Sequence, residues 1–162
     1  MARAVAGDQG HDGLTPRQQE RIEHAVSLCR TENGLDVSVL VGDLDLADLS
    51  QFRSAAQRLH AALGERAAGA VLLVVAPGQR RVEVVTGPGV RRRVPDRVCA
   101  LTILAMTSAF AGGDLTGGVI DALRQIAESA GRRPALSPVE RVAGGDVAVR
   151  GAAALHERPA RT

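Results

Sequence analysis

Three aspartates lie close together in the first third of the chain: Asp43, Asp45 and Asp48. They follow the apolar, Val-containing segment 35–41, whose pattern predicts a strand, so we expect them in a loop at its carboxyl end. Closely spaced carboxylates suit the hard cations Ca²⁺ and Mg²⁺. The loop is therefore a candidate cation site, and the alternative is a solvated acidic loop that caps the helix after it.

The Asp43-x-Asp45 spacing also resembles the nucleophile motif of haloacid-dehalogenase-type phosphotransferases, in which one Asp attacks phosphorus and the other acts as acid or base beside Mg²⁺. That mechanism also needs a Lys that balances charge on the phosphoryl group. All twenty basic residues of this chain are Arg, so it has no such Lys. The same composition excludes Schiff-base lysines and the lysine of a P-loop.

A second candidate site is the segment 86–93, Thr-Gly-Pro-Gly-Val-Arg-Arg-Arg. A glycine-rich corner ahead of a helix can bind an anion through backbone N–H groups, and guanidinium groups bind phosphate or carboxylate. We predict an anion- or partner-binding site there; the alternative is an exposed Arg-rich turn paired with local carboxylates. Its candidate residues are Arg81, Gly87, Gly89, Arg91, Arg92 and Arg93.

The first half of the chain predicts the elements that position the acidic loop. Thr15 and Gln18 form a capping box around a Pro, which predicts a helix that ends at Asn33-Gly34. The segments 35–41 and 71–75 are predicted strands with a helix between them, and such a unit implies a right-handed crossover between parallel strands.

The second half predicts the elements around the glycine corner. Pro77-Gly78 predicts a turn into an antiparallel strand over 81–86. One helix is predicted from Pro95 to about Phe110, and because it is apolar nearly all round we expect it to be covered on most sides. A last helix is expected after Asp114, which would cap it.

Composition excludes several classes of function. The net charge of +2 and the two aromatic residues do not fit a nucleic-acid-binding surface. Cys29 and Cys99 are interpreted as buried free thiols, and His60 as a packing residue. We see neither a signal peptide nor a membrane span, and we predict a cytoplasmic location.

The order of several motifs resembles the TPM domain, named for the thylakoid lumen 18.3 kDa protein, and is most similar to a small actinobacterial branch of unknown function. The motifs run from Thr31-Glu32-Asn33-Gly34 through the strand 69–75 and Thr86-Gly87 to Gly113-Asp114 and Gly117-Gly118. The resemblance implies a three-layer α/β/α sandwich with a small mixed β-sheet of about four strands. We expect a flexible segment 1–13, one TPM-like domain over 14–130 and a mostly disordered tail over 131–162.

The resemblance also implies two kinds of function, because some relatives are metal-dependent acid phosphatases and others are accessory domains. Asp43, Asp45, Asp96 and Asp114 would be the metal ligands of a phosphatase, with Ca²⁺ or Mg²⁺ as the cofactor. The chain departs from the family pattern by carrying Arg91 after the glycine corner and alanines at 67 and 68, where relatives carry acidic or amide groups. We therefore expect a non-catalytic module that binds a protein or an anionic ligand, with a weak metal-dependent acid phosphatase as the alternative.

Overall fold

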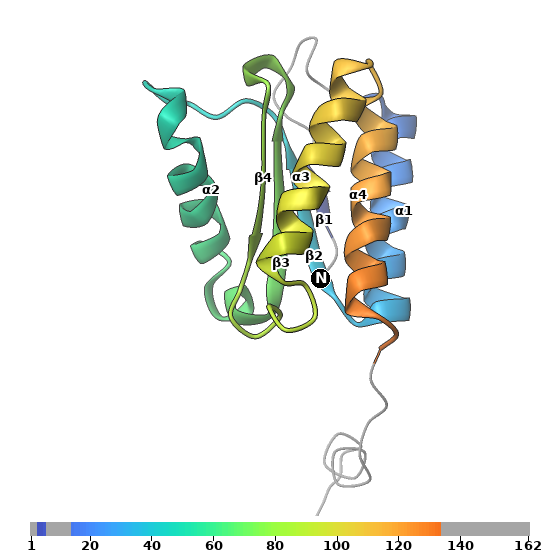
Figure 1. Ribbon diagram of the computed structural model, residues 1–162. Coiled ribbons are helices and arrows are strands. Elements are labelled where there is room, and N and C mark those ends of the chain that lie inside the picture. The colour runs from blue at the N-terminus through green and yellow to red at the C-terminus, as the bar shows by residue number, and fades with distance from the viewer. Residues whose placement is uncertain (1–2, 6–13, 134–162) are drawn as a thin grey trace, which may run out of the picture.

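The computed structural model describes residues 3–5 and 14–133, and it has three layers (Figure 1). A four-stranded sheet lies in the middle, with helix α2 on one face and helices α1, α3 and α4 on the other. This arrangement confirms the α/β/α sandwich with a small mixed sheet that was expected from the sequence.

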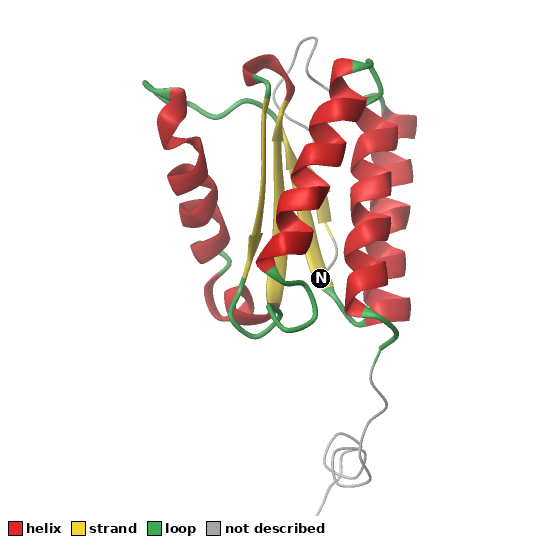
Figure 2. Ribbon diagram, in the orientation of Figure 1, coloured by secondary structure: helices red, strands yellow, loops and turns green. Residues whose placement is uncertain are grey.

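The sheet has the strand order β1-β2-β3-β4 (yellow in Figure 2). Strands β1 (Arg3–Val5), β2 (Asp36–Val41) and β3 (Ala70–Ala76) are parallel, whereas β4 (Arg81–Thr86) runs antiparallel to β3. Both crossovers between the parallel strands pass through helices, as parallel neighbours require.

Four α-helices and three short 3₁₀-helices complete the described fold: α1 (Pro16–Asn33), η2 (Leu49–Gln51), α2 (Phe52–Ala61), η3 (Gly64–Gly69), η4 (Pro77–Gln79), α3 (Asp96–Ala111) and α4 (Leu115–Ala130). The capping box predicted at Thr15 is present, and Gly34 ends α1 with the left-handed φ of 65°. No helix of the described residues is long and apolar enough to cross a membrane.

Alternation along the strands divides the core between the two faces of the sheet. Val37, Val39 and Val41 of β2 belong to the larger core, beneath α1, α3 and α4. Leu72 and Val74 of β3 belong to the smaller core, which packs against Phe52 and Ala56 of α2. All seven residues of β3 are buried, because helices cover both of its faces.

The structure differs from two expectations. Arg3–Val5 form a strand on the edge of the sheet, within a stretch that was expected to be flexible. Helix α3 is less covered than its composition predicted, since Leu101 and Leu104 are 62% and 67% exposed. The remainder of the segment 1–13 and the predicted tail beyond residue 133 lie outside the described residues.

The loops and turns of the sandwich gather at two ends, an upper and a lower one. The upper end contains the last residues of β2 and β3, the turn from Pro77 to Arg80 and the turn between α3 and α4 (top of Figure 1). The lower end contains the first residues of β2 and β3, the corner 86–95 that follows β4, and the last turns of α1 and α4.

Candidate functional site

The structure does not bring the four predicted metal ligands together. Asp43 and Asp45 follow β2 at the upper end, whereas Asp96 and Asp114 lie at opposite ends of the 16-residue helix α3, which is about 24 Å long. In residues 3–5 and 14–133, no three His, Cys, Asp or Glu side chains are grouped so that they could hold a metal ion.

Backbone N–H groups donate to Asp43 and Asp48 of the acidic loop and to Asp114, the cap of the last helix. Asp43 Oδ1 accepts the N–H of Gly78 at 3.0 Å, and Asp114 Oδ1 accepts the N–H of Gly117 at 2.9 Å, as predicted for the cap of α4. Asp48 Oδ1 accepts the N–H of Ser50 at 2.9 Å, and this bond lowers the pKa of Asp48. The acidic loop therefore holds a turn and caps η2, which is the structural alternative that we left open.

The glycine corner cannot bind an anion through Gly87 and Gly89, because their N–H groups already have acceptors. Gly87 donates to the Ala70 carbonyl at 3.0 Å, and Gly89 donates to the Ala68 carbonyl at 2.7 Å. A Cβ at Gly87 would overlap the carbonyl oxygens of Ala67 and Ala68. The glycines are thus needed for the close approach of the corner to η3, and this corrects their predicted role as an anion cradle.

The arginines predicted around the corner do not form one cluster. Arg81 begins β4 at the upper end, whereas Arg91, Arg92 and Arg93 follow β4 at the lower end. Arg91 Nη2 donates to the carbonyl of Thr86 at 3.3 Å, and Arg92 is exposed. Only Arg91 and Arg92 of this set are therefore both close together and exposed.

Arg93 connects the last turns of two helices. Its Nη2 donates to the Asn33 carbonyl of α1 at 2.6 Å, and its Nε donates to the Ala130 carbonyl of α4 at 3.3 Å. The side-chain amide of Asn33 in turn donates to the carbonyls of Ala127 and Gly131. The last carbonyls of a helix lack partners within the helix and carry partial negative charge, so one guanidinium stabilises both ends.

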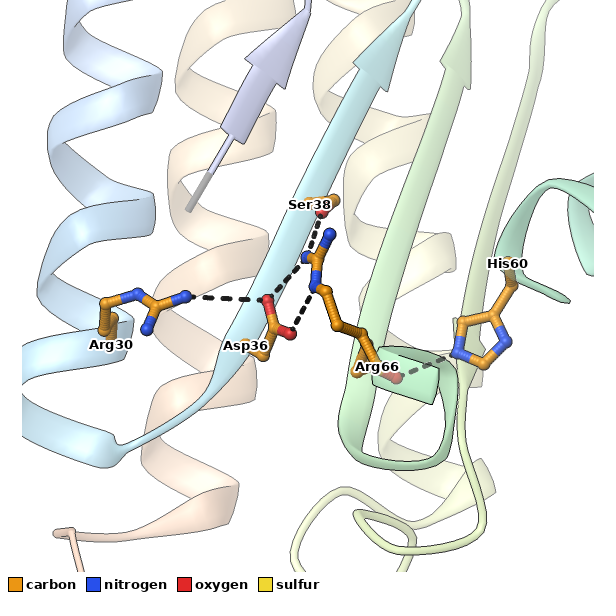
Figure 3. Close-up of polar contacts among 6 residues, drawn as sticks. Arg30, Asp36, Ser38, His60 and Arg66 are labelled. Carbon is orange, nitrogen blue, oxygen red and sulfur yellow. Dashed lines mark hydrogen bonds and ion pairs between the residues drawn. The ribbon is translucent and has the colours of Figure 1, made fainter. Parts of the chain in front are cut away.

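A polar cluster that was not predicted lies at the start of β2 (Figure 3). The Asp36 carboxylate accepts two hydrogen bonds from Arg66, at 2.9 and 3.0 Å, and lies 3.8 Å from Arg30 Nη2. Burial would raise the pKa of Asp36, but the hydrogen bonds and charge of Arg66 lower it overall. The cluster fastens η3 and α1 to β2. Arg66 and Asp36 are 30 positions apart in the sequence, so no local sequence pattern indicates the cluster.

His60, Cys29 and Cys99 are buried residues whose side chains could in principle act as nucleophiles. His60 is buried, and its Nε2 lies 3.0 Å from the carbonyl of Ala70, which fits the packing role interpreted from the sequence. Cys29 and Cys99 are buried free thiols, as expected. Burial raises the pKa of Cys29 to about 11 and also raises that of Cys99. Neither thiol is therefore a ready nucleophile at neutral pH.

The most unusual surface of the described residues is the outer stripe of α3, which we define as Leu101, Leu104, Ser108 and Ala111. These residues recur at intervals of three or four, so they lie on one side of the helix. No charged residue occurs between Arg97 and Asp114. An exposed helix face normally carries charged or polar side chains, so this stripe is a candidate contact surface.

A cleft of about 490 Å³ opens at the upper end, between the β3–β4 turn and the α3–α4 turn. Its apolar lining comes from Ala76, Pro77, Val82, Phe110, Ala111 and Leu115. Arg80 and Thr107 add one guanidinium and one hydroxyl. Sequence reasoning missed this cleft because its walls come from two turns that are about 30 residues apart.

The chain is similar to proteins whose descriptions assign no function. The "Uncharacterized protein Rv2468c" and the "Uncharacterized protein MT2543", both of Mycobacterium tuberculosis, are 45% identical to it over 65 residues, which is 40% of this chain. The match spans 38% of the length of each relative.

Solved structures share the fold. The N-terminal domain of a P. gingivalis protein has a TM-score of 0.63 at 22% identity, over 78% of this chain and 80% of that one. The N-terminal domain of the cg2496 protein from Corynebacterium glutamicum has a TM-score of 0.63 at 16% identity, over 82% and 83%. The BA42 protein from Bizionia argentinensis has a TM-score of 0.65 at 17% identity, over 75% and 84%. At such identities the likeness shows the fold alone.

A family model described as "Domain of unknown function (DUF5130)" matches residues 6–127, which contain the whole glycine corner, all four predicted metal ligands and most of α4. The chain therefore belongs to the family of DUF5130 domains.

Proposed function

We propose that this domain is a non-catalytic interaction module that binds a protein through the outer stripe of α3, and that the bound protein is a second copy of the chain. The observation that carries the proposal is the exposure of Leu101 and Leu104, 62% and 67%, on a helix face without a charged residue. Exposed apolar surface on a folded domain favours association, because burying it removes apolar area from water.

Charge favours a second copy in the antiparallel orientation. Arg97 lies one turn before Leu101, and Asp114 lies just beyond the other end of α3. When two α3 helices pack antiparallel across a two-fold axis, Arg97 of each copy approaches Asp114 of the other, and Leu104 lies near the centre. The two helix dipoles are then opposed, which is also favourable.

The expected association is weak. Each fully buried leucine contributes roughly 1.5–3 kcal/mol, and a two-fold pair would bury four partly exposed leucines. Association itself costs at least about 4 kcal/mol. Because only about two-thirds of each leucine is exposed, their burial contributes roughly 4–8 kcal/mol, and the difference of at most about 4 kcal/mol corresponds to a dissociation constant on the order of 1 mM or weaker. Such a module responds to the local concentration of the chain.

Sedimentation velocity of the full chain, from about 10 µM to about 1 mM, tests the proposal. We expect the average mass to rise with concentration in the unchanged protein and to stay monomeric in Leu104→Glu. The matched control is Leu28→Glu, which places the same charge on an exposed leucine away from the outer stripe, 44% exposed on α1. A monomer at every concentration, or equal association in Leu104→Glu, would contradict the proposal.

The alternative of a metal-dependent phosphatase has no comparable support, since Asp96 lies at the lower end, away from Asp43, Asp45 and Asp114, and no three acidic, His or Cys side chains of the described residues are grouped for a metal ion. The kinship with the TPM domain is also kept as a proposal. It is supported by the ordered motifs from Thr31 to Gly118 and by the sandwich they were expected to form. A cytoplasmic location stays a prediction.

A further inference from the structure

We infer that the cleft at the upper end binds a monoanionic aliphatic carboxylate, with Arg80 holding the carboxylate and the apolar walls holding the tail. This site is separate from the proposed pairing through Leu101 and Leu104, although Ala111 borders both. The inference rests on three observations: the shape and lining of the cleft, the single guanidinium in that lining, and the backbone conformation of Arg80.

The lining selects the class of ligand. The volume of about 490 Å³ is in the range of small-molecule pockets. Among the described residues that line it there is no carboxylate, amide or imidazole, and Phe110 is the single aromatic. Small aliphatic side chains such as Ala76, Val82 and Leu115 favour a hydrocarbon chain over a sugar or a base. One guanidinium favours one negative charge.

Arg80 is free to make that contact. In the part of the chain that the structure describes, no hydrogen bond or ion pair engages its guanidinium, and its backbone N–H donates to the Pro77 carbonyl at 3.2 Å. The nearby acidic groups are otherwise engaged. Asp43 accepts the N–H of Gly78, and Asp114 caps α4. Neither carboxylate is a hydrogen-bonding partner of Arg80.

The conformation of Arg80 adds an independent argument. With φ 54° and ψ 44°, it is the one non-glycine residue with positive φ among the described residues. Glycine adopts this conformation without the Cβ conflict that other residues meet. An arginine here accepts a backbone cost that a glycine would avoid, which is what we expect where the side chain itself is used.

The other polar side chain of the lining, Thr107, fits the same class of ligand. The Thr107 hydroxyl donates to the Ile103 carbonyl of its own helix at 2.8 Å. Its proton is therefore committed, and the oxygen can only accept. Arg80 is left as the one side chain of the lining that can donate to a bound anion.

The test uses decanoate below its micelle concentration, added to the full-length ¹⁵N-labelled protein and followed by NMR. We expect saturable shifts in the amides of 76–82 and 107–115, and at least about tenfold weaker binding of decanol, which lacks the charge, and of acetate, which lacks the tail. The titration is repeated in Leu104→Glu, so that failure of the pairing proposal does not affect the result.

Arg80→Gly is the decisive variant, because glycine retains the turn while it removes the guanidinium. We expect its melting temperature to be equal or higher and its affinity for decanoate to fall at least about tenfold. Arg92→Ala, which removes an exposed arginine at the lower end, should bind as the unchanged protein does. A second variant, Ala111→Trp, should also abolish the shifts, because the larger side chain would fill the cleft.

Three outcomes would overturn the inference. The first is the absence of saturable shifts in decanoate at millimolar concentration. The second is equal affinity in Arg80→Gly, which would show an unspecific detergent-like interaction. The third is a set of shifts confined to the middle of α3, which would place the ligand on the outer stripe instead of in the cleft.

Discussion

Two turns of this domain contain the same residue types, Gly, Pro and Arg, but differ in whether their hydrogen-bond donors have partners within the fold. At the lower end, the corner 86–95 has its glycine N–H groups bonded to the carbonyls of Ala68 and Ala70, and Arg93 bonded to two helix ends. At the upper end, the turn from Pro77 to Arg80 places the Arg80 guanidinium beside a cleft. Among the described residues this guanidinium has no hydrogen-bond or ion-pair partner. The composition of a turn therefore does not distinguish a structural turn from a binding site. What distinguishes them is whether the hydrogen-bond donors of the turn already have acceptors within the fold.

The largest loss of stability is expected from Gly87→Ala, which places a side chain where the corner 86–95 contacts η3. Because the new Cβ would overlap the carbonyl oxygens of Ala67 and Ala68, the corner must move away from η3. We expect a loss of about 3 kcal/mol in the free energy of unfolding, measured by urea denaturation. The matched control is Gly69→Ala, where a Cβ would meet nothing within 4 Å. Equal effects of the two substitutions would contradict the close-approach argument.

Arg93→Ala should have the next largest effect, because it removes the cap shared by α1 and α4. The carbonyls of Asn33 and Ala130 would lose a charged donor in a partly buried setting. We expect a loss of about 2 kcal/mol, again from urea denaturation.

Arg92→Ala is the companion measurement for Arg93, since Arg92 is exposed one position earlier. Its effect should stay within about 0.5 kcal/mol. If both variants lose the same stability, the role assigned to Arg93 is wrong and the corner is a general electrostatic feature.

The smallest effect concerns pH and the Asp36 cluster. Because the folded state lowers the pKa of Asp36, this carboxylate stabilises the fold above the ordinary Asp value of about 4 and loses that contribution as pH falls toward the lowered value. Unfolding at pH 5 and pH 3 should therefore show a smaller acid sensitivity in Asp36→Asn, with a loss of about 1 kcal/mol or less at pH 5. An unchanged pH slope would show that other carboxylates account for it.

Sequence reasoning succeeded where the cause is local. The capping box at Thr15, the left-handed Gly34 and the cap at Asp114 each depend on residues within a few positions. Apolar runs predicted the strands β2 and β3, and a turn followed by β-branched residues predicted β4. Strand β1 was missed because three residues are too few to show alternation.

Whether the candidate sites are available for binding depends on residues far away in the sequence, so it could not be predicted from local patterns. The acceptors of Gly87 and Gly89 arrive from positions 17 and 21 residues earlier, and those of Arg93 from two different helices. The exposure of Leu104 depends on how many helices cover that face of the sheet, which the pattern of α3 itself does not contain. A pattern identifies donors, whereas the tertiary fold decides whether they have acceptors.

The two buried thiols give this molecule a pair of internal reporters. Cys29 lies in α1 and Cys99 in α3, and both are protected from reagents by burial and by a raised pKa. The rate at which each reacts with a thiol reagent then measures how often its own helix opens. Equal rates would mean that the helical layer opens as one unit, whereas faster reaction at Cys99 would mean that α3 separates first. Without any introduced label, the native chain can therefore report the order in which its helical layer comes apart.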